Sequence, residues 1–199
     1  IQLNGLPNID ETFIDFKADK LTTNSRDLQR LFPDIKSAVP GGLTALSLIN
    51  FKGSFTGFIN DFVAYGDFNT NLGYLHSDIN MKTGHYHRVP VYSGNLSGRA
   101  LDIGTLFGMD YLGPATFDAT VKGRGFALND LRATLKADIN TLTVNDYAYK
   151  HIQTNGEFNG KLFSGKLEMQ DPNASLNFNG TINLNDTVPQ FDFRAEVLN

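Results

Sequence analysis

Apolar and polar residues alternate along most of this chain with a period of two. In residues 49–82, INFKGSFTGFINDFVAYGDFNTNLGYLHSDINMK, nearly every second position is apolar or glycine, and the positions between are mostly Lys, Ser, Thr, Asp or Asn. The alternation recurs in residues 92–98, 117–123 and 135–139, and it is clearest in residues 176–184. Because successive side chains of a strand point to opposite faces, this period predicts many strands with one apolar and one polar face.

Short turns separate the predicted strands. In residues 170–175, QDPNAS, Pro172 presets the φ angle of a turn and Asn173 suits its second central position. Strands joined by such turns pair as antiparallel neighbours, so the chain is expected to form a meander. Glycines recur on the apolar face, where they usually mark a bulge, a bend or close packing, and they predict a strongly curved sheet.

Helical signals are confined to two places. Residues 25–32, SRDLQRLF, have Ser25 as a candidate N-cap and are followed by Pro33, which ends the run. The second place is LDIGTLFG, residues 101–108. The predicted fold class is therefore all-β, an antiparallel meander with one or two short helices at a sheet end.

The chain is long enough to bury a core. Its 199 residues are 41% hydrophobic, and they predict a single β-rich unit over residues 1–199. The chain opens with IQLNG and stops just after an alternating run, as expected for a piece of a longer repetitive protein. It has no signal peptide and no run of about 18 apolar residues, the length that spans a membrane as a helix.

The charge and the absence of cysteine exclude several functions. The net charge is −4, with 17 Lys and Arg against 21 Asp and Glu, and no basic cluster is long enough to follow a phosphate backbone. No nucleic acid partner is therefore expected. Without Cys there are no disulfides, thiolate nucleophiles or cysteine-ligated metals. The absence of Cys does not indicate the cellular compartment, since cysteine-free chains occur in the cytosol and outside it.

Four histidines raise the question of a metal site: His76, His85, His87 and His151. His85 and His87 would share one face of an extended segment, a spacing that transition metals use, but no third ligand is evident nearby. A turn next to Gly84 is a usual place for exposed polar residues. We therefore expect structural histidines and neither a metal nor another cofactor.

No motif indicates catalysis. GRGFAL, residues 123–128, lacks the third glycine and the helix-opening context of a phosphate loop, and it predicts a bulge or a tight turn. There is no Ser/His/Asp arrangement with nucleophile-elbow spacing, and a carbohydrate-active enzyme is disfavoured by the lack of Trp. Five carboxylates alternate with apolar neighbours and are expected to be surface charges: Asp61, Asp67, Asp78, Asp118 and Asp138. The chain is predicted not to be an enzyme.

The positive hypothesis rests on the apolar face. A sheet with one apolar face must cover it with a second layer of protein or with an apolar ligand, and two short helices are too few to cover many strands. The face is therefore either a groove for acyl chains or an ordinary packed core. Its expected lining is Phe51, Phe55, Phe68, Leu72, Ile79, Leu96, Phe117, Val121, Leu135, Ile139, Phe158, Leu162, Leu167, Leu176, Phe178, Ile182, Phe191 and Phe193.

The repeated phrases resemble those of one family. Residues 49–82, then YSGNLSGRALDIGTLFG, residues 92–108, and NGEFNGKLFSGKLEMQDPNASLNFNGTINLN, residues 155–185, are similar to the repetitive region of TamB proteins. TamB is the translocation and assembly module subunit of the AsmA-like superfamily, and the resemblance is to the form seen in Bacteroidetes. The resemblance extends from about Phe13 to Val197.

This resemblance implies an elongated sheet folded into a taco-like, U-shaped trough with an apolar interior. It further implies a periplasmic protein, anchored in the inner membrane by a helix outside this segment, that carries phospholipids toward the outer membrane and supports outer-membrane biogenesis. A BamA-type outer-membrane barrel is the partner it suggests. The alternative is an assembly scaffold that binds such a barrel by β-strand addition, with no lipid in the groove.

Overall fold

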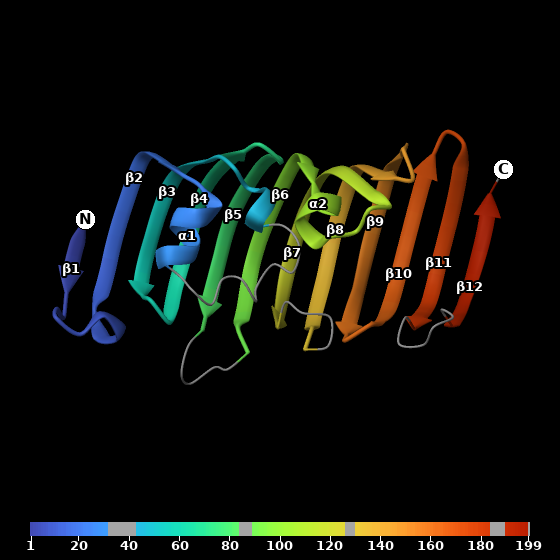
Figure 1. The fold of residues 1–199 in the computed structure, drawn as a ribbon. Helices are drawn as coiled ribbons and strands as arrows, with labels where there is room; N and C mark the ends of the chain where they lie inside the picture. Colours follow the sequence, from blue (N-terminus) through green and yellow to red (C-terminus); the bar gives the residue numbers. More distant parts are fainter. Residues whose placement is uncertain (32–42, 84–88, 126–129, 184–189, 199) are drawn as a thin grey trace.

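The structure, a computed structural model, describes residues 1–31, 43–83, 89–125, 130–183 and 190–198. These residues form one sheet of twelve strands, which lie side by side in the order of the sequence. Figure 1 shows the strands in a single layer, with the two chain termini at opposite ends of the sheet. The strands are β1 (Gln2–Asn4), β2 (Phe13–Thr23), β3 (Ile49–Phe58), β4 (Asp61–Thr70), β5 (Gly73–Lys82), β6 (Val91–Asp102), β7 (Leu112–Arg124), β8 (Arg132–Val144), β9 (Tyr147–Asn159), β10 (Leu162–Asp171), β11 (Ala174–Asn183) and β12 (Gln190–Leu198).

Every pair of neighbouring strands is antiparallel, which confirms the predicted all-β meander. The predicted turn at Pro172 and Asn173 is present, because Asp171 pairs with Ala174 across it. The sheet is not closed into a barrel within the described residues, since β1 and β12 each have a single neighbour.

The turn between β8 and β9 follows the geometry that hairpins favour. Asn145 and Asp146 have φ angles of 48° and 66°, and Val144 pairs with Tyr147 on either side of them. Two central residues with positive φ are typical of a type I′ turn, whose twist matches that of the strands, and Asn and Asp tolerate this conformation better than most residues.

The first predicted helix is present as α1 (Ser25–Leu31), but its cap differs from the prediction. The Oδ1 atom of Asn24 accepts hydrogen bonds from the backbone N–H groups of Arg26 (2.9 Å) and Asp27 (3.1 Å). Asn24 is therefore the N-cap, and Ser25 is the first residue of the helix, with its own N–H donated to the carbonyl of Leu46. Pro33 lies outside the described residues.

The second predicted helix is α2 (Ile103–Phe107). Asp102 caps its start by accepting a hydrogen bond from the N–H of Thr105, and Gly108 ends it in the left-handed conformation at φ 67°. Figure 1 shows α1 and α2 in front of the sheet. Short 3₁₀ turns occupy Ile9–Glu11 and Leu43–Ala45. In the part of the chain described, no helix has the length and apolar character needed to cross a membrane.

The ladder is interrupted at a few places where one strand carries extra residues. The register shifts between Ala18 and Leu21 on β2, and between Gly98 and Leu101 on β6. Ala100 has a φ of 46° within the second break. Bulges of this kind bend a strand and increase its twist, so they contribute curvature to the sheet as the glycines were expected to do.

Few apolar side chains are buried among the described residues. They are Ile49, Ile79, Leu101, Ala115, Ala137, Ile152 and Phe178. A sheet with a second layer packed over its whole apolar face would bury many more, because each strand would contribute its inward residues to the core. Most of the apolar side chains are instead half-buried by their neighbours within the sheet.

Candidate functional site

The register gathers the predicted groove residues on one face of the sheet. One row runs across the strands as Phe51, Phe68, Leu75, Gly98, Phe117, Ile139, Ile152, Met169 and Leu176, each paired with the next. Directly opposite residues of an antiparallel pair point to the same face, so the whole row shares a face. We call this side of the sheet the apolar face.

Two further rows continue the apolar face. Phe55, Ala64, Ile79, Gly94, Val121, Leu135 and Gly156 form one, and Leu96, Ala119, Ala137, Thr154, Leu167 and Phe178 form another. Phe158 pairs with Phe163, which pairs with Ile182, in a fourth row. On β12 the backbone of Phe191 pairs with that of Ile182, and the backbone of Phe193 pairs with that of Gly180. These two positions are therefore in register with the apolar face.

Two predicted residues fall outside this face. Leu162 pairs with Asn159 and Asn183, so it belongs to the polar face at the first position of β10. Leu72 lies in the turn between Thr70 and Gly73 and is not part of a strand. The sequence pattern missed Phe62, Phe163 and Met169, which are in register with the others, as is Met81.

Aromatic rings contact one another along the apolar face. The ring centroids of Phe51 and Phe68 are 4.8 Å apart, those of Phe55 and Phe62 4.5 Å, and those of Phe158 and Phe163 5.1 Å. Each of these pairs joins neighbouring strands. Such cross-strand aromatic pairs stabilise a sheet beyond the area they bury, so they hold the face together without a covering layer.

Glycines on the apolar face make room for these rings. A Cβ atom added at Gly156 would lie 2.5 Å from Cε2 of Phe163, and one added at Gly98 would meet Cζ of Phe117 at 2.8 Å. The rings therefore lie over the glycine backbones instead of standing away from the sheet. A close approach of this kind is a recognised use of glycine inside strands.

A few polar groups sit among the apolar ones. Tyr92 lies on the apolar face and donates its hydroxyl to the carbonyl of Gly125 at 3.0 Å, and burial raises the pKa of Tyr92. At the other end of the strands the buried carboxylate of Asp171 accepts hydrogen bonds from the hydroxyl of Tyr147 (2.7 Å) and the N–H of Asn173 (2.9 Å). The N–H of Asn173 is the main cause that lowers the pKa of Asp171.

The polar face carries the five carboxylates that were expected at the surface. Asp61, Asp78, Asp118 and Asp138 are exposed, and Asp67 is half-buried. Asp67 accepts a hydrogen bond from the hydroxyl of Tyr74 (2.6 Å) and lies 2.8 Å from Nδ1 of His76. These two contacts, Tyr74 first, hold the pKa of Asp67 below its usual value.

A second pairing on this face joins β6 and β7. Arg99 contacts Asp118 at 3.1 Å. The pKa of Asp118 is lowered by a hydrogen bond from Ser97 and by Arg99. These contacts link strands across the polar face and bring no nucleophile to a general base.

The histidines and the glycine loop are only partly described. His76 contacts Asp67, and His151 is exposed on β9, whereas His85 and His87 lie outside the described residues. Among the residues that the structure describes, no group of three or more His, Cys, Asp or Glu is placed to hold a metal ion. In the GRGFAL stretch, Gly125 follows β7 at φ 72° and donates its N–H to Pro90, and residues 126–129 are not described.

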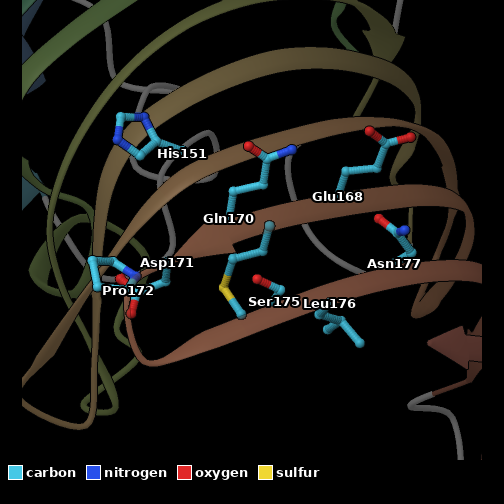
Figure 2. Close-up of a pocket in the computed structure, with 9 residues that line it drawn as sticks. His151, Glu168, Gln170, Asp171, Pro172, Ser175, Leu176 and Asn177 are labelled. Carbon is cyan, nitrogen blue, oxygen red and sulfur yellow. The ribbon is translucent and has the colours of Figure 1, made fainter. Parts of the chain in front are cut away.

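The sequence pattern also missed a hollow beside β9, β10 and β11, which residues of both faces of the sheet line. Nine residues line a space of about 490 Å³, among them His151, Glu168, Gln170, Ser175 and Asn177. Figure 2 shows Glu168, Gln170 and Asn177 pointing to one side of their strands and Leu176 to the other, where the strands arch along their length. Only the unusual backbone of His151, at φ 51°, marks this place, and a sequence does not reveal it.

Comparisons with protein-family models, curated proteins and solved structures give no match for this chain. The apolar face is therefore interpreted from its own residues.

Proposed function

We propose that this chain is a non-enzymatic segment of a bridge between the inner and outer membranes, which carries phospholipids along an apolar groove and supports outer-membrane biogenesis. In this proposal the sheet is curled into a U-shaped trough, and the apolar face forms its interior. The protein is a TamB-like member of the AsmA-like superfamily and lies in the periplasm. The resemblance of residues 49–82, 92–108 and 155–185 to that family motivates the assignment.

One observation carries the proposal. Apolar residues from β2 to β11 fall in register on a single face, and the described residues provide no second sheet to cover that face. The rows of apolar residues run across the strands, and the sheet lengthens in the same direction as strands are added. A continuous apolar surface in this direction can serve as a path along a long protein. Acyl chains satisfy such a surface without requiring specific polar contacts.

The energetics suit transport. Each methylene removed from water is worth about 0.8 kcal/mol, and an acyl chain that passes from a bilayer to an apolar groove stays out of water throughout. The transfer is then close to neutral in free energy. Half-buried rings such as those of Phe55 and Phe117 provide this environment while leaving their surface accessible.

The test is photo-crosslinking in cells. A benzoylphenylalanine residue is placed at Phe55, Phe117 or Phe178, and at Asn179 as the matched control, because Asn179 follows Phe178 on β11 and faces the opposite side. We expect phospholipid adducts, identified by mass spectrometry, at the three apolar positions and not at Asn179. Equal adducts at Phe178 and Asn179, or none at any apolar position, would contradict the proposal.

A second function is favoured by the open edges of the sheet. In the part described, β12 pairs only with β11, and β1 pairs with just three residues of β2. Unpaired edge strands are templates for strand addition, so an assembly scaffold that pairs with a BamA-type barrel is the alternative. Crosslinks from β12 to a barrel protein, with no lipid adduct at Phe55, would support the scaffold.

A further inference from the structure

The two ends of the strands are built differently. The even-numbered strands from β2 to β10 finish at one end, where α1 connects β2 to β3 and α2 connects β6 to β7. Figure 1 shows both helices in front of the sheet. We call this end the helix rim, and the end where the odd-numbered strands finish the far rim.

The apolar face is covered close to the helix rim. Ile49 and Ala115 lie two residues before Phe51 and Phe117 in their strands, so they share the apolar face, and Leu101 pairs with Ala115. Ile49, Leu101 and Ala115 are 4%, 5% and 2% exposed. The helix α2 contacts β7 and the 3₁₀ turn before β3. A lipid on the apolar face therefore meets protein at this end.

Hydrogen bonds join the successive connections of the helix rim. The N–H of Asp102, at the start of α2, is donated to the carbonyl of Leu72 in the turn from β4 to β5 at 2.7 Å. The N–H of Asn145, in the turn from β8 to β9, is donated to the carbonyl of Tyr111 at 2.9 Å. These bonds hold the connections from β4 to β9 together along this rim.

The far rim is basic where β7, β8, β9 and β10 meet. Arg124 is the last residue of β7, Arg132 is the first of β8, and Lys161 lies in the turn from β9 to β10. The N–H of Gly160 is donated to the carbonyl of Leu131 at 2.6 Å, which brings Lys161 beside Arg132. We call Arg124, Arg132 and Lys161 the basic patch.

The charges at the two rims are opposite in sign over these strands. The strand ends and turns of the helix rim from β6 to β10 carry Asp102, Asp110, Asp146 and Asp171, whereas Asp130 accompanies the basic patch on the far rim. The chain as a whole has a net charge of −4. A phosphate group is therefore attracted to the basic patch and repelled from the helix rim.

Two cations of the basic patch are placed directly opposite each other. Arg124 pairs with Arg132, and both residues are exposed. Within the described ranges no carboxylate forms an ion pair with either arginine or with Lys161. Like charges in this position destabilise a sheet. An anion between the two guanidinium groups removes the repulsion, and phosphate suits them because a guanidinium can donate two parallel hydrogen bonds to it.

The basic patch borders the apolar face. Ala133 follows Arg132 on β8 and pairs with Phe158, which pairs with Phe163. Consecutive residues of a strand are about 3.4 Å apart, and long basic side chains keep their charged heads in water while their stems lie along apolar surface. The patch can therefore hold a phosphate at the rim while the acyl chains of the same molecule lie against these rings.

We propose that the basic patch binds the headgroup phosphate of a phospholipid whose acyl chains lie on the apolar face, and that it selects lipids with a net negative headgroup. This inference rests on the proposed function and adds an orientation to it, with headgroups at the far rim and acyl chains extending toward the helix rim. The cations favour phosphatidylglycerol over phosphatidylethanolamine, because the ammonium group of the latter is repelled by them.

The test is lipid capture by the purified chain from vesicles that contain equal amounts of phosphatidylglycerol and phosphatidylethanolamine with the same acyl chains. Flotation removes the vesicles, and mass spectrometry counts the lipids bound to the recovered chain. We expect phosphatidylglycerol to be enriched about five-fold, the size expected for exposed charge contacts. In the double variant Arg124→Gln, Arg132→Gln, the ratio of bound lipids should return to that of the vesicles.

The matched control is the double variant Lys136→Gln, Lys166→Gln. It removes the same charge from exposed positions inside β8 and β10, and we expect it to keep the enrichment. The arginine double variant should unfold at an equal or higher urea concentration than the unchanged chain, because the like-charge pair is gone. Its loss of selectivity would then not be due to unfolding.

The outcomes separate this inference from the proposed function. Lipid bound without enrichment, or an equal loss of enrichment in the two double variants, would overturn the inference and leave the proposed function standing. Loss of the enrichment on adding inorganic phosphate would assign the patch to a free anion, and a chain that floats with the vesicles but carries no lipid would dock on a bilayer surface; either result would overturn the inference. No bound lipid and no flotation would overturn both proposals.

Discussion

The contact between Gly98 and Phe117 permits a sharp test of how the apolar face is built. These residues are paired on β6 and β7, and a Cβ atom added at Gly98 would touch only the Phe117 ring among its three nearest atoms, with Cζ at 2.8 Å and Cδ1 at 3.0 Å. In the Gly98→Ala variant the ring must therefore move or the strands must shift. Overpacking of this kind costs about 1–3 kcal/mol of unfolding free energy.

The effect of Gly98→Ala on the unfolding free energy is expected to have the opposite sign once the Phe117 ring is removed. In a Phe117→Ala background no ring opposes the added methyl group, and replacing glycine by alanine lowers the entropy of the unfolded chain. Gly98→Ala is then expected to stabilise the protein by about 0.4–1 kcal/mol. Phe117→Ala alone is expected to destabilise by about 3 kcal/mol, at the lower end for a lost aromatic ring because Phe117 is only half-buried.

The assay is urea unfolding of the four proteins in this cycle, followed by far-ultraviolet circular dichroism. The two effects of Gly98→Ala differ by more than about 1 kcal/mol, within the range measured for residues in direct contact. If Gly98→Ala has the same effect with and without the Phe117 ring, the ring does not lie over the glycine. The account of the apolar face as rings laid over glycine backbones would then be refuted.

Two further predictions concern acid and a turn. The pKa values of Asp67, Asp118 and Asp171 are lowered from 3.8, so the unfolded state binds more protons in acid, and the unfolding free energy should hold above pH 3.8 and fall below it. Urea unfolding at pH 7 and at pH 3 measures this loss of unfolding free energy. An Asp67→Asn variant should lose less unfolding free energy between the two pH values than the unchanged protein. An equal loss would contradict the lowered pKa of Asp67 as a source of stability. Asp146→Gly relieves a φ of 66° and should stabilise by about 0.5–1 kcal/mol, measured by thermal unfolding, whereas Asp146→Ala should not.

Some of the candidate site is visible in the sequence because strand alternation is a local property. The faces of Phe51, Phe55, Phe117 and Phe178 were predicted correctly, since each lies in the middle of an alternating run. Leu162 was not, because a turn of two residues reverses the parity of the alternation, and Asn159 pairs with Leu162 across such a turn. An alternation counted through the turn therefore assigns the residue to the opposite face.

Other features depend on contacts between distant residues. The N-cap of α1 is Asn24 and not Ser25, because the side chain of Asn24 accepts the N–H groups of Arg26 and Asp27, while the N–H of Ser25 is donated to Leu46 beyond the helix. Asp171 resembles the other aspartates in the sequence, yet it is buried, and it gathers the side chain of Tyr147 and the N–H of Lys150 at the end of β10. No local pattern records these partners.

The sequence by itself determined that the chain is all-β, where most strands and turns lie, and that each strand has an apolar and a polar face. Alternation with period two contains this information for each strand separately. The tertiary structure alone decided which residues of different strands meet, because register depends on the length of every turn and the position of every bulge. The alignment of Asp138, Gln153, Glu168 and Asn177 in one row, and the opening beside His151, arise only when those local geometries are added together across the sheet.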